Sequence, residues 1–208
     1  MNYFPYALLS YLKKNIGLYI LITSFFVSGI VAGSIATGLI SDSQLDSILN
    51  YFNGFISNVN NIHINPASVF YASAANNLKI ALIIILFGLT IIGMPVILAM
   101  IFFRGFILGF TVGFIINHLG VEGVFFTLLS ILPQNLIIIP SMLSIGVTGV
   151  AFSLQIIKLR RRATTDSYGQ LLGGYVISNC VFSLMLVIGG LIEGYISPVF
   201  IKMMTHYM

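Results

Sequence analysis

Asp42 and Asp46 are the first residues of this chain whose types and spacing could do chemistry. Paired carboxylates catalyse glycan hydrolysis, so two of them at positions i and i+4 could in principle serve that reaction. The same charges also favour a helix start, because the helix dipole stabilises acidic side chains near an N-terminus. We therefore interpret both aspartates as helix-start charges.

The histidines and the cysteine do not form a reactive group in the sequence. His63, His118 and His206 are far apart, none has a second metal ligand at i+4, and Cys180 is the single cysteine. Zinc sites and intramolecular disulfides need more closely grouped or paired residues than this. Nucleophile motifs, phosphate loops and dinucleotide-binding motifs are also missing from the sequence. We expect no catalytic residues, no metal and no cofactor.

Five polar residues lie within or beside apolar runs: Arg104, Glu122, Gln134, Asn135 and Glu193. A charge is costly inside a bilayer, so it marks a functional site or a buried pair unless it snorkels to the headgroups. Arg104 and Glu122 would be partners under the first interpretation, whereas all three charges would sit at span ends under the second. Gln134 and Asn135 are predicted to satisfy backbone groups freed by the preceding proline.

The elements that must position these residues are membrane helices. The chain has 208 residues, of which 58% are hydrophobic and 7% charged, and its mean hydropathy is +1.06. Soluble domains carry about 25% charged residues, and each membrane span needs about 20 apolar residues. We predict one all-α membrane domain, a polytopic helical protein of about five spans with proline-broken or re-entrant segments.

The net charge of +4 does not indicate nucleic-acid binding, because the basic residues flank apolar runs. Lys13 and Lys14 precede the first run, and Lys158 with the three arginines at 160–162 follows a later one. By the positive-inside rule both clusters are predicted to be cytoplasmic. With the N-terminus inside, five crossings leave the C-terminus outside.

The first half of the chain divides at its polar stretch. Span 1 is predicted at 16–40, and residues 41–79 form an extracytoplasmic segment. Apolar residues recur there at helical spacing and predict an amphipathic helix. Asn65-Pro66 favours the start of a second helix that runs into the membrane, because proline suits a first helical turn.

The apolar run from Ile80 to Asn117 is too long for one span and must turn inside. A turn at Arg104 gives span 2 at 80–103 and a short or re-entrant span 3 at 105–117, which is the division we adopt here. A turn at Gly93-Met94-Pro95 would instead place Arg104 near mid-membrane. The sequence does not choose between these turns.

The second half contains a broken span 4 at 121–157, interrupted around Pro133, then a basic cytoplasmic loop at 158–170 and span 5 at 171–196. Irregular backbone at membrane depth must be buried in protein or line a wet cavity. The interior of the protein is therefore predicted to lie at this break.

Glycines spaced four residues apart favour tight helix packing in membranes. They occur in three runs, as Gly29 and Gly33, as Gly105, Gly109 and Gly113, and as Gly190 and Gly194. These faces could pack within one chain or form the seam of a homodimer.

A set of short motifs resembles the stage II sporulation protein M family of endospore-forming bacteria. The resemblance spans nearly the whole chain and is carried by Gly93-Met94-Pro95-Val96-Ile97, Arg104-Gly105, residues 109–114, Leu119-Gly120, Leu132-Pro133-Gln134-Asn135, residues 151–154 and residues 193–198.

The resemblance implies a non-enzymatic membrane scaffold that works during engulfment of the forespore. Such a scaffold would recruit two peptidoglycan hydrolases, stage II sporulation proteins D and P, to the mother-cell side of the septum and the engulfing membrane. We expect the outer amphipathic helix to contact these partners through Leu45, Leu49, Phe52 and Phe55. The alternative is that this helix caps the bundle.

A rival hypothesis is a small-solute or ion transporter or channel, because transporters bind their substrates at broken membrane helices. The chain shows no inverted repeat and few membrane carboxylates for a proton relay. An intramembrane protease is set aside, because its nucleophile or paired aspartates are missing.

Overall fold

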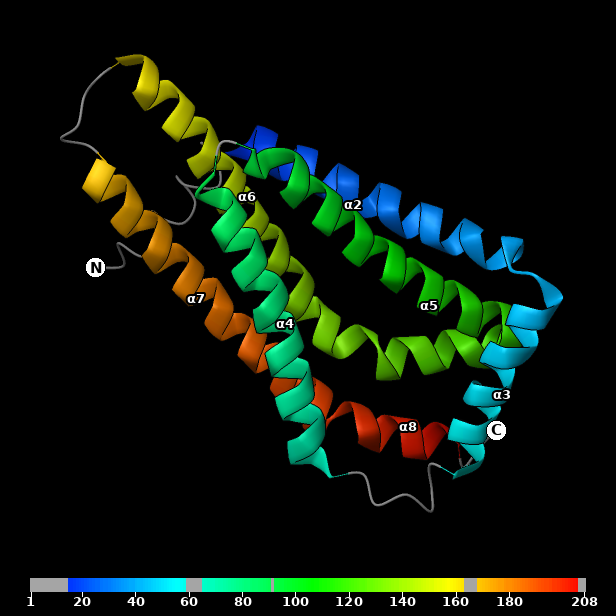
Figure 1. The fold of residues 1–208 in the computed structure, drawn as a ribbon. Helices are drawn as coiled ribbons and strands as arrows, with labels where there is room; N and C mark the ends of the chain where they lie inside the picture. The colour runs from blue at the N-terminus through cyan, green and yellow to red at the C-terminus, as the bar shows by residue number, and fades with distance from the viewer. Residues whose placement is uncertain (1–14, 59–64, 91, 163–167, 206–208) are drawn as a thin grey trace.

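The computed structural model describes residues 15–58, 65–90, 92–162 and 168–205 (Figure 1). Within these ranges the secondary structure is helical, with no strand, and five helices are long and apolar enough to cross a membrane. This confirms the predicted all-α polytopic class. The elements are α2 Ile16–Ala36, η1 Thr37–Leu39, α3 Asp42–Asn58, α4 Pro66–Gly88, α5 Gly93–Ser130, α6 Leu132–Arg162, α7 Tyr168–Tyr195 and α8 Ser197–Thr205.

Helix α4 begins where the sequence predicts, and it is long enough by itself to cross a membrane. The Asn65 side chain caps it by accepting a hydrogen bond from the Ala67 N–H at 3.0 Å, and Pro66 occupies the first turn. Its 23 residues cover about 34 Å at 1.5 Å per residue, which exceeds the hydrocarbon core of about 30 Å. Residues 66–79, which we assigned to the extracytoplasmic segment, are therefore part of span 2.

The chain turns between Gly88 and Gly93, which corrects the adopted division into spans 80–103 and 105–117. Helix α5 starts at Gly93 and places Arg104 inside the span. This arrangement is stable because Arg104 has a hydrogen-bond partner on α4. The second of the two alternatives, a turn at Gly93-Met94-Pro95, is thus the one that the structure contains.

Helix α5 reverses direction at Gly120, whose φ of 59° and ψ of −128° are non-helical. Glycine adopts a positive φ without the steric cost of a Cβ atom. The segment 121–130 then returns along the end of α5, where Gly123 lies against the backbone of Ile115. The helix breaks again at Ile131, just before Pro133, and continues as α6. The predicted broken span thus consists of a short returning helix and α6.

Helix α6 lies at the centre of the bundle. In the most apolar stretch of α6, 67% of the residues are buried, against 22–28% in the corresponding stretches of the other four spans. Its Ile138, Ile145, Val147 and Val150 form a core with side chains from α2, α4, α5 and α7. Pro140 lies inside α6 without ending it.

Helices α2 and α5 run side by side in the same direction (Figure 1). Gly29 and Gly33 of α2 face the backbone of α5, and Gly105 and Gly109 of α5 face the backbone of α2. A Cβ atom at any of these four positions would collide with a carbonyl oxygen of the other helix. The glycines therefore bring the two helices into backbone contact within one chain.

Two short helices cover the end of the bundle that lies away from residues 158–162, which we call the outer end (Figure 1). Leu45, Ile48, Leu49 and Phe52 of α3 pack with Ile201 of α8 on a cluster formed by Phe114, Ile115 and Phe126. Because α3 and α8 share this cluster, they lie on the same side of the bundle.

Candidate functional site

A chain of hydrogen bonds connects a cation to a carboxylate inside the bundle. Arg104 Nη2 donates to Asn77 Oδ1 at 2.9 Å, Asn77 Nδ2 donates to Ser73 Oγ at 3.2 Å, and Ser73 Oγ donates to Glu193 Oε2 at 2.6 Å. Asn77 and Ser73 are buried. We call these four residues the intramembrane network. It joins α5, α4 and α7.

Each helix presents its member of the network for a local reason. Ser73 and Asn77 are one helical turn apart on α4, so both point to the same face. Arg104 precedes Gly105, whose contact with α2 fixes the rotation of α5. Gly194 follows Glu193 and lies against the backbone of Phe70, which brings the end of α7 close to α4. The small residues thus set the distances at which the polar side chains meet.

A cavity of about 240 Å³ adjoins the network. Its lining residues come from α5, α6, α7 and the break between α5 and α6, and they are Arg104, Ile107, Leu108, Thr111, Ile131, Gln134, Asn135, Ile138 and Glu193. The predicted interior at the helix break therefore coincides with this cavity.

The two amides of the cavity are partly engaged by the protein itself. Gln134 is buried and accepts a hydrogen bond from Ser197 Oγ at 2.8 Å. Asn135 donates to the backbone carbonyl of Ile131 at 2.7 Å, directly at the break before Pro133. Asn135 thus satisfies a backbone carbonyl at the helix break, whereas Gln134 ties α6 to the first residue of α8.

Glu122 is the one predicted membrane-embedded residue that lies elsewhere. It is exposed, two residues after the Gly120 reversal, so it is not the partner of Arg104. The groups that face Arg104 instead belong to Asn77 and Glu193. Sequence reasoning missed Ser73 and Asn77 because it placed α4's first turns outside the membrane.

The outer amphipathic helix turns its apolar side toward the protein. Phe52 makes edge-on contacts with Phe114, His118 and Phe126, and Leu45 and Leu49 pack on the same cluster. The described contacts of these three side chains are therefore within the chain, as the capping alternative anticipates. The Phe55 side chain lies outside what the structure describes.

The remaining glycine pair packs α7 on α4. Gly190 lies against Ala74 and Gly194 against Phe70, while Gly113 of α5 contacts Ser34 and Thr37 at the end of α2. All seven predicted glycines therefore sit at contacts between helices of one chain.

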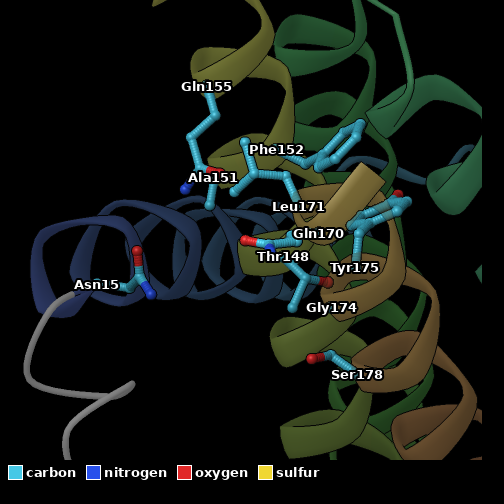
Figure 2. A pocket seen from close by; sticks show the side chains of 10 residues that line it. All are labelled: Asn15, Thr148, Ala151, Phe152, Gln155, Gln170, Leu171, Gly174, Tyr175 and Ser178. Carbon is cyan, nitrogen blue, oxygen red and sulfur yellow. The ribbon is translucent and has the colours of Figure 1, made fainter. Parts of the chain in front are cut away.

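A second cavity of about 270 Å³ lies toward the opposite end, between α2, α6 and α7 (Figure 2). Figure 2 shows Thr148, Phe152 and Tyr175 around it, with Asn15 facing it from the start of α2. The Phe152 and Tyr175 rings stack with their centroids 4.5 Å apart, and the Tyr175 hydroxyl donates to the Ile85 carbonyl at 2.8 Å. These contacts tie α6, α7 and α4 together.

The fold and the network define a polytopic helical membrane protein whose polar interior is built from its own side chains. A family model described as stage II sporulation protein M matches residues 22–198, and the chain belongs to that family. It is therefore a membrane protein of a sporulation-related family, one that is not known as a family of enzymes. Searches of curated proteins and of solved structures give no match to this chain.

Proposed function

We propose that this protein is a non-enzymatic scaffold that recruits peptidoglycan hydrolases for forespore engulfment. Its partners would be stage II sporulation proteins D and P, held on the mother-cell side of the sporulation septum and the engulfing membrane. The observation that carries this proposal is the family match over residues 22–198.

The organisation of the polar residues supports a scaffold. Arg104 and Glu193 are joined through Asn77 and Ser73, and Gln134 is bonded to Ser197. Such networks between helices fix one arrangement of a membrane bundle. A rigid bundle suits a protein that holds others in place.

The outer end offers a surface on the side where peptidoglycan lies. Helices α3 and α8 cover this end, and Tyr51 of α3 is 85% exposed. Large aromatic side chains are enriched among the residues that anchor protein partners. The exposed side of α3 is therefore a better docking surface than the apolar side that packs on the bundle.

A detergent affinity purification from sporulating cells tests the proposal. The tagged chain should recover both hydrolases, detected by immunoblotting, and fluorescent hydrolase fusions should leave the septum when the chain is deleted. Recovery of the chain alone from an extract that contains both hydrolases, with their localisation unchanged in the deletion strain, would refute the scaffold.

A further inference from the structure

Lys79 is a cation on the exposed side of the membrane helix α4. It lies near the middle of α4, and its side chain is exposed. Within the described part of the chain no hydrogen bond or ion pair reaches it. Intramembrane cations normally face a protein interior or a wet cavity and have a partner there.

The depth of Lys79 separates it from the headgroups. At 1.5 Å per residue it lies about 14 Å from the end of α4 and about 20 Å from its start. Lysines snorkel to the headgroups when they lie near a helix end. A four-carbon stem does not span these distances, so lipid headgroups are a poor match for this ammonium group.

The surface around Lys79 has the features of a helix-packing face. Ala72, Ala75, Asn76 and Leu82 are exposed and lie at helical spacing with Lys79. The two alanines allow another helix to approach closely, and the Asn76 amide adds a donor and an acceptor. The buried residues Ser73 and Asn77 lie on the other side of α4, in the network.

A second copy of this chain does not supply the matching charge. Its five acidic residues are Asp42, Asp46, Glu122, Asp166 and Glu193. The first two belong to α3, Glu122 follows the reversal of α5 at Gly120, and Asp166 falls in sequence between α6 and α7. Glu193 is bonded to Ser73 inside the bundle. A carboxylate partner for Lys79 would therefore have to come from a different protein.

We propose that the exposed face of α4 around Lys79 binds a transmembrane helix of another protein that carries an acidic side chain at mid-membrane. Charge complementarity at a depth without water gives the contact its specificity. The partner's role as a recruited protein rests on the proposed scaffold function, whereas the surface itself is argued from α4 alone.

A defined peptide assay tests this surface. The full chain, labelled with a donor dye at Cys180, is reconstituted in phosphatidylethanolamine vesicles with an acceptor-labelled model transmembrane peptide. Three peptides differ only at their central residue, which is Glu, Gln or Leu. The Glu peptide should associate about tenfold more tightly than the Leu peptide, because it alone presents a carboxylate to Lys79.

Matched variants assign the effect to one residue. Lys79→Leu should remove the preference for the Glu peptide, Lys79→Arg should retain it, and Lys158→Leu, which removes an exposed cation near the end of α6, should leave it unchanged. Equal association of the three peptides with the unmodified chain would overturn the proposal without any question of misfolding. Association that disappears when the vesicles contain phosphatidylglycerol would assign Lys79 to lipid and also overturn it.

The two proposals fail in different ways. Equal hydrolase recovery by the unmodified chain and by Lys79→Leu would refute this surface as the site that recruits the hydrolases, and it would leave the scaffold in place. A selective peptide response from a chain that recovers no hydrolase would keep the surface and refute the scaffold.

Discussion

Asn77 connects the two charged side chains of the network, because it is bonded both to Arg104 and to Ser73. A buried polar group without a partner costs more free energy than a hydrogen bond contributes. Removing Asn77 would therefore affect the protein mainly by leaving the Arg104 guanidinium without its described hydrogen bond, while Ser73 would keep its bond to Glu193. Its neighbour Asn76 has the same chemistry on the exposed side of α4.

Asn77→Ala should lower the stability of the protein by about 1–2 kcal/mol. Thermal unfolding in detergent, followed by size-exclusion chromatography, measures the change. The control is Asn76→Ala, which should remain within about 0.5 kcal/mol of the unmodified chain because it breaks no described hydrogen bond. Equal melting temperatures for both variants would show that the network does not stabilise the fold.

At the scale of elements, α2 and α5 pack closely because the residues between them are glycines, which have no side chain. Lipid offers no hydrophobic drive between helices, so close backbone contact supplies the packing energy. At Gly109 an added Cβ atom would collide with the backbone carbonyl of Ile30, and backbone atoms cannot move aside as a flexible side chain can. By contrast, a Cβ atom added at Gly17, near the start of α2, would meet open space.

Gly109→Ala should destabilise the protein by about 3 kcal/mol, at the upper end of the cost of overpacking. Gly17→Ala is the matched control and should be neutral or stabilising by up to about 1 kcal/mol, because alanine favours the helix. Urea or thermal unfolding in detergent compares the two. A tolerated alanine at Gly109 would mean that α2 and α5 do not pack this closely.

The two sides of α3 separate packing from partner binding. Leu49 faces the cluster of Phe114, Ile115 and Phe126, whereas Tyr51 is exposed. Leu49→Asp would place a charge in that cluster and should cost about 2 kcal/mol, while Tyr51→Asp should stay within about 0.5 kcal/mol. Unfolding measurements test these values.

The same two variants also test docking. If the exposed side of α3 binds the hydrolases, Tyr51→Asp should reduce their recovery at an unchanged level of the scaffold. Reduced recovery by Leu49→Asp alone, at full stability, would return the contact to the apolar side of α3, where Leu45, Leu49 and Phe52 were predicted to bind.

At the scale of the whole molecule, the scaffold and the rival transporter hypothesis differ in whether solutes cross the membrane, so a direct flux assay separates the two functions. Gln134 lines the cavity beside the intramembrane network and is bonded to Ser197. In a scaffold these contacts hold the helix break, and no solute has to pass them.

Purified protein in liposomes should pass no ions or small solutes, as measured by dye-based flux assays against empty vesicles. A specific flux that Gln134→Ala abolishes would establish transport instead. The control is Leu136→Ala, because Leu136 lies on the exposed side of the same helix and does not line the cavity.

The sequence by itself determined the class of the protein, because the bilayer, rather than the neighbouring helices, sets the length of the apolar runs and the position of the basic residues. It also predicted the helix start at Asn65-Pro66 and the glycines at helix contacts, since both follow from local backbone chemistry. The family resemblance rested on motifs within residues 91–198, which the family match includes.

Only the tertiary structure decided where the long apolar run turns and which polar groups meet. A mid-membrane Arg104 is costly for an isolated helix, and it becomes acceptable when α4 supplies Asn77. The pairing of Arg104 with α4 and α7 instead of Glu122 depends on the Gly120 reversal, which moves Glu122 to the surface. Such contacts join residues far apart in the chain, so no local pattern encodes them.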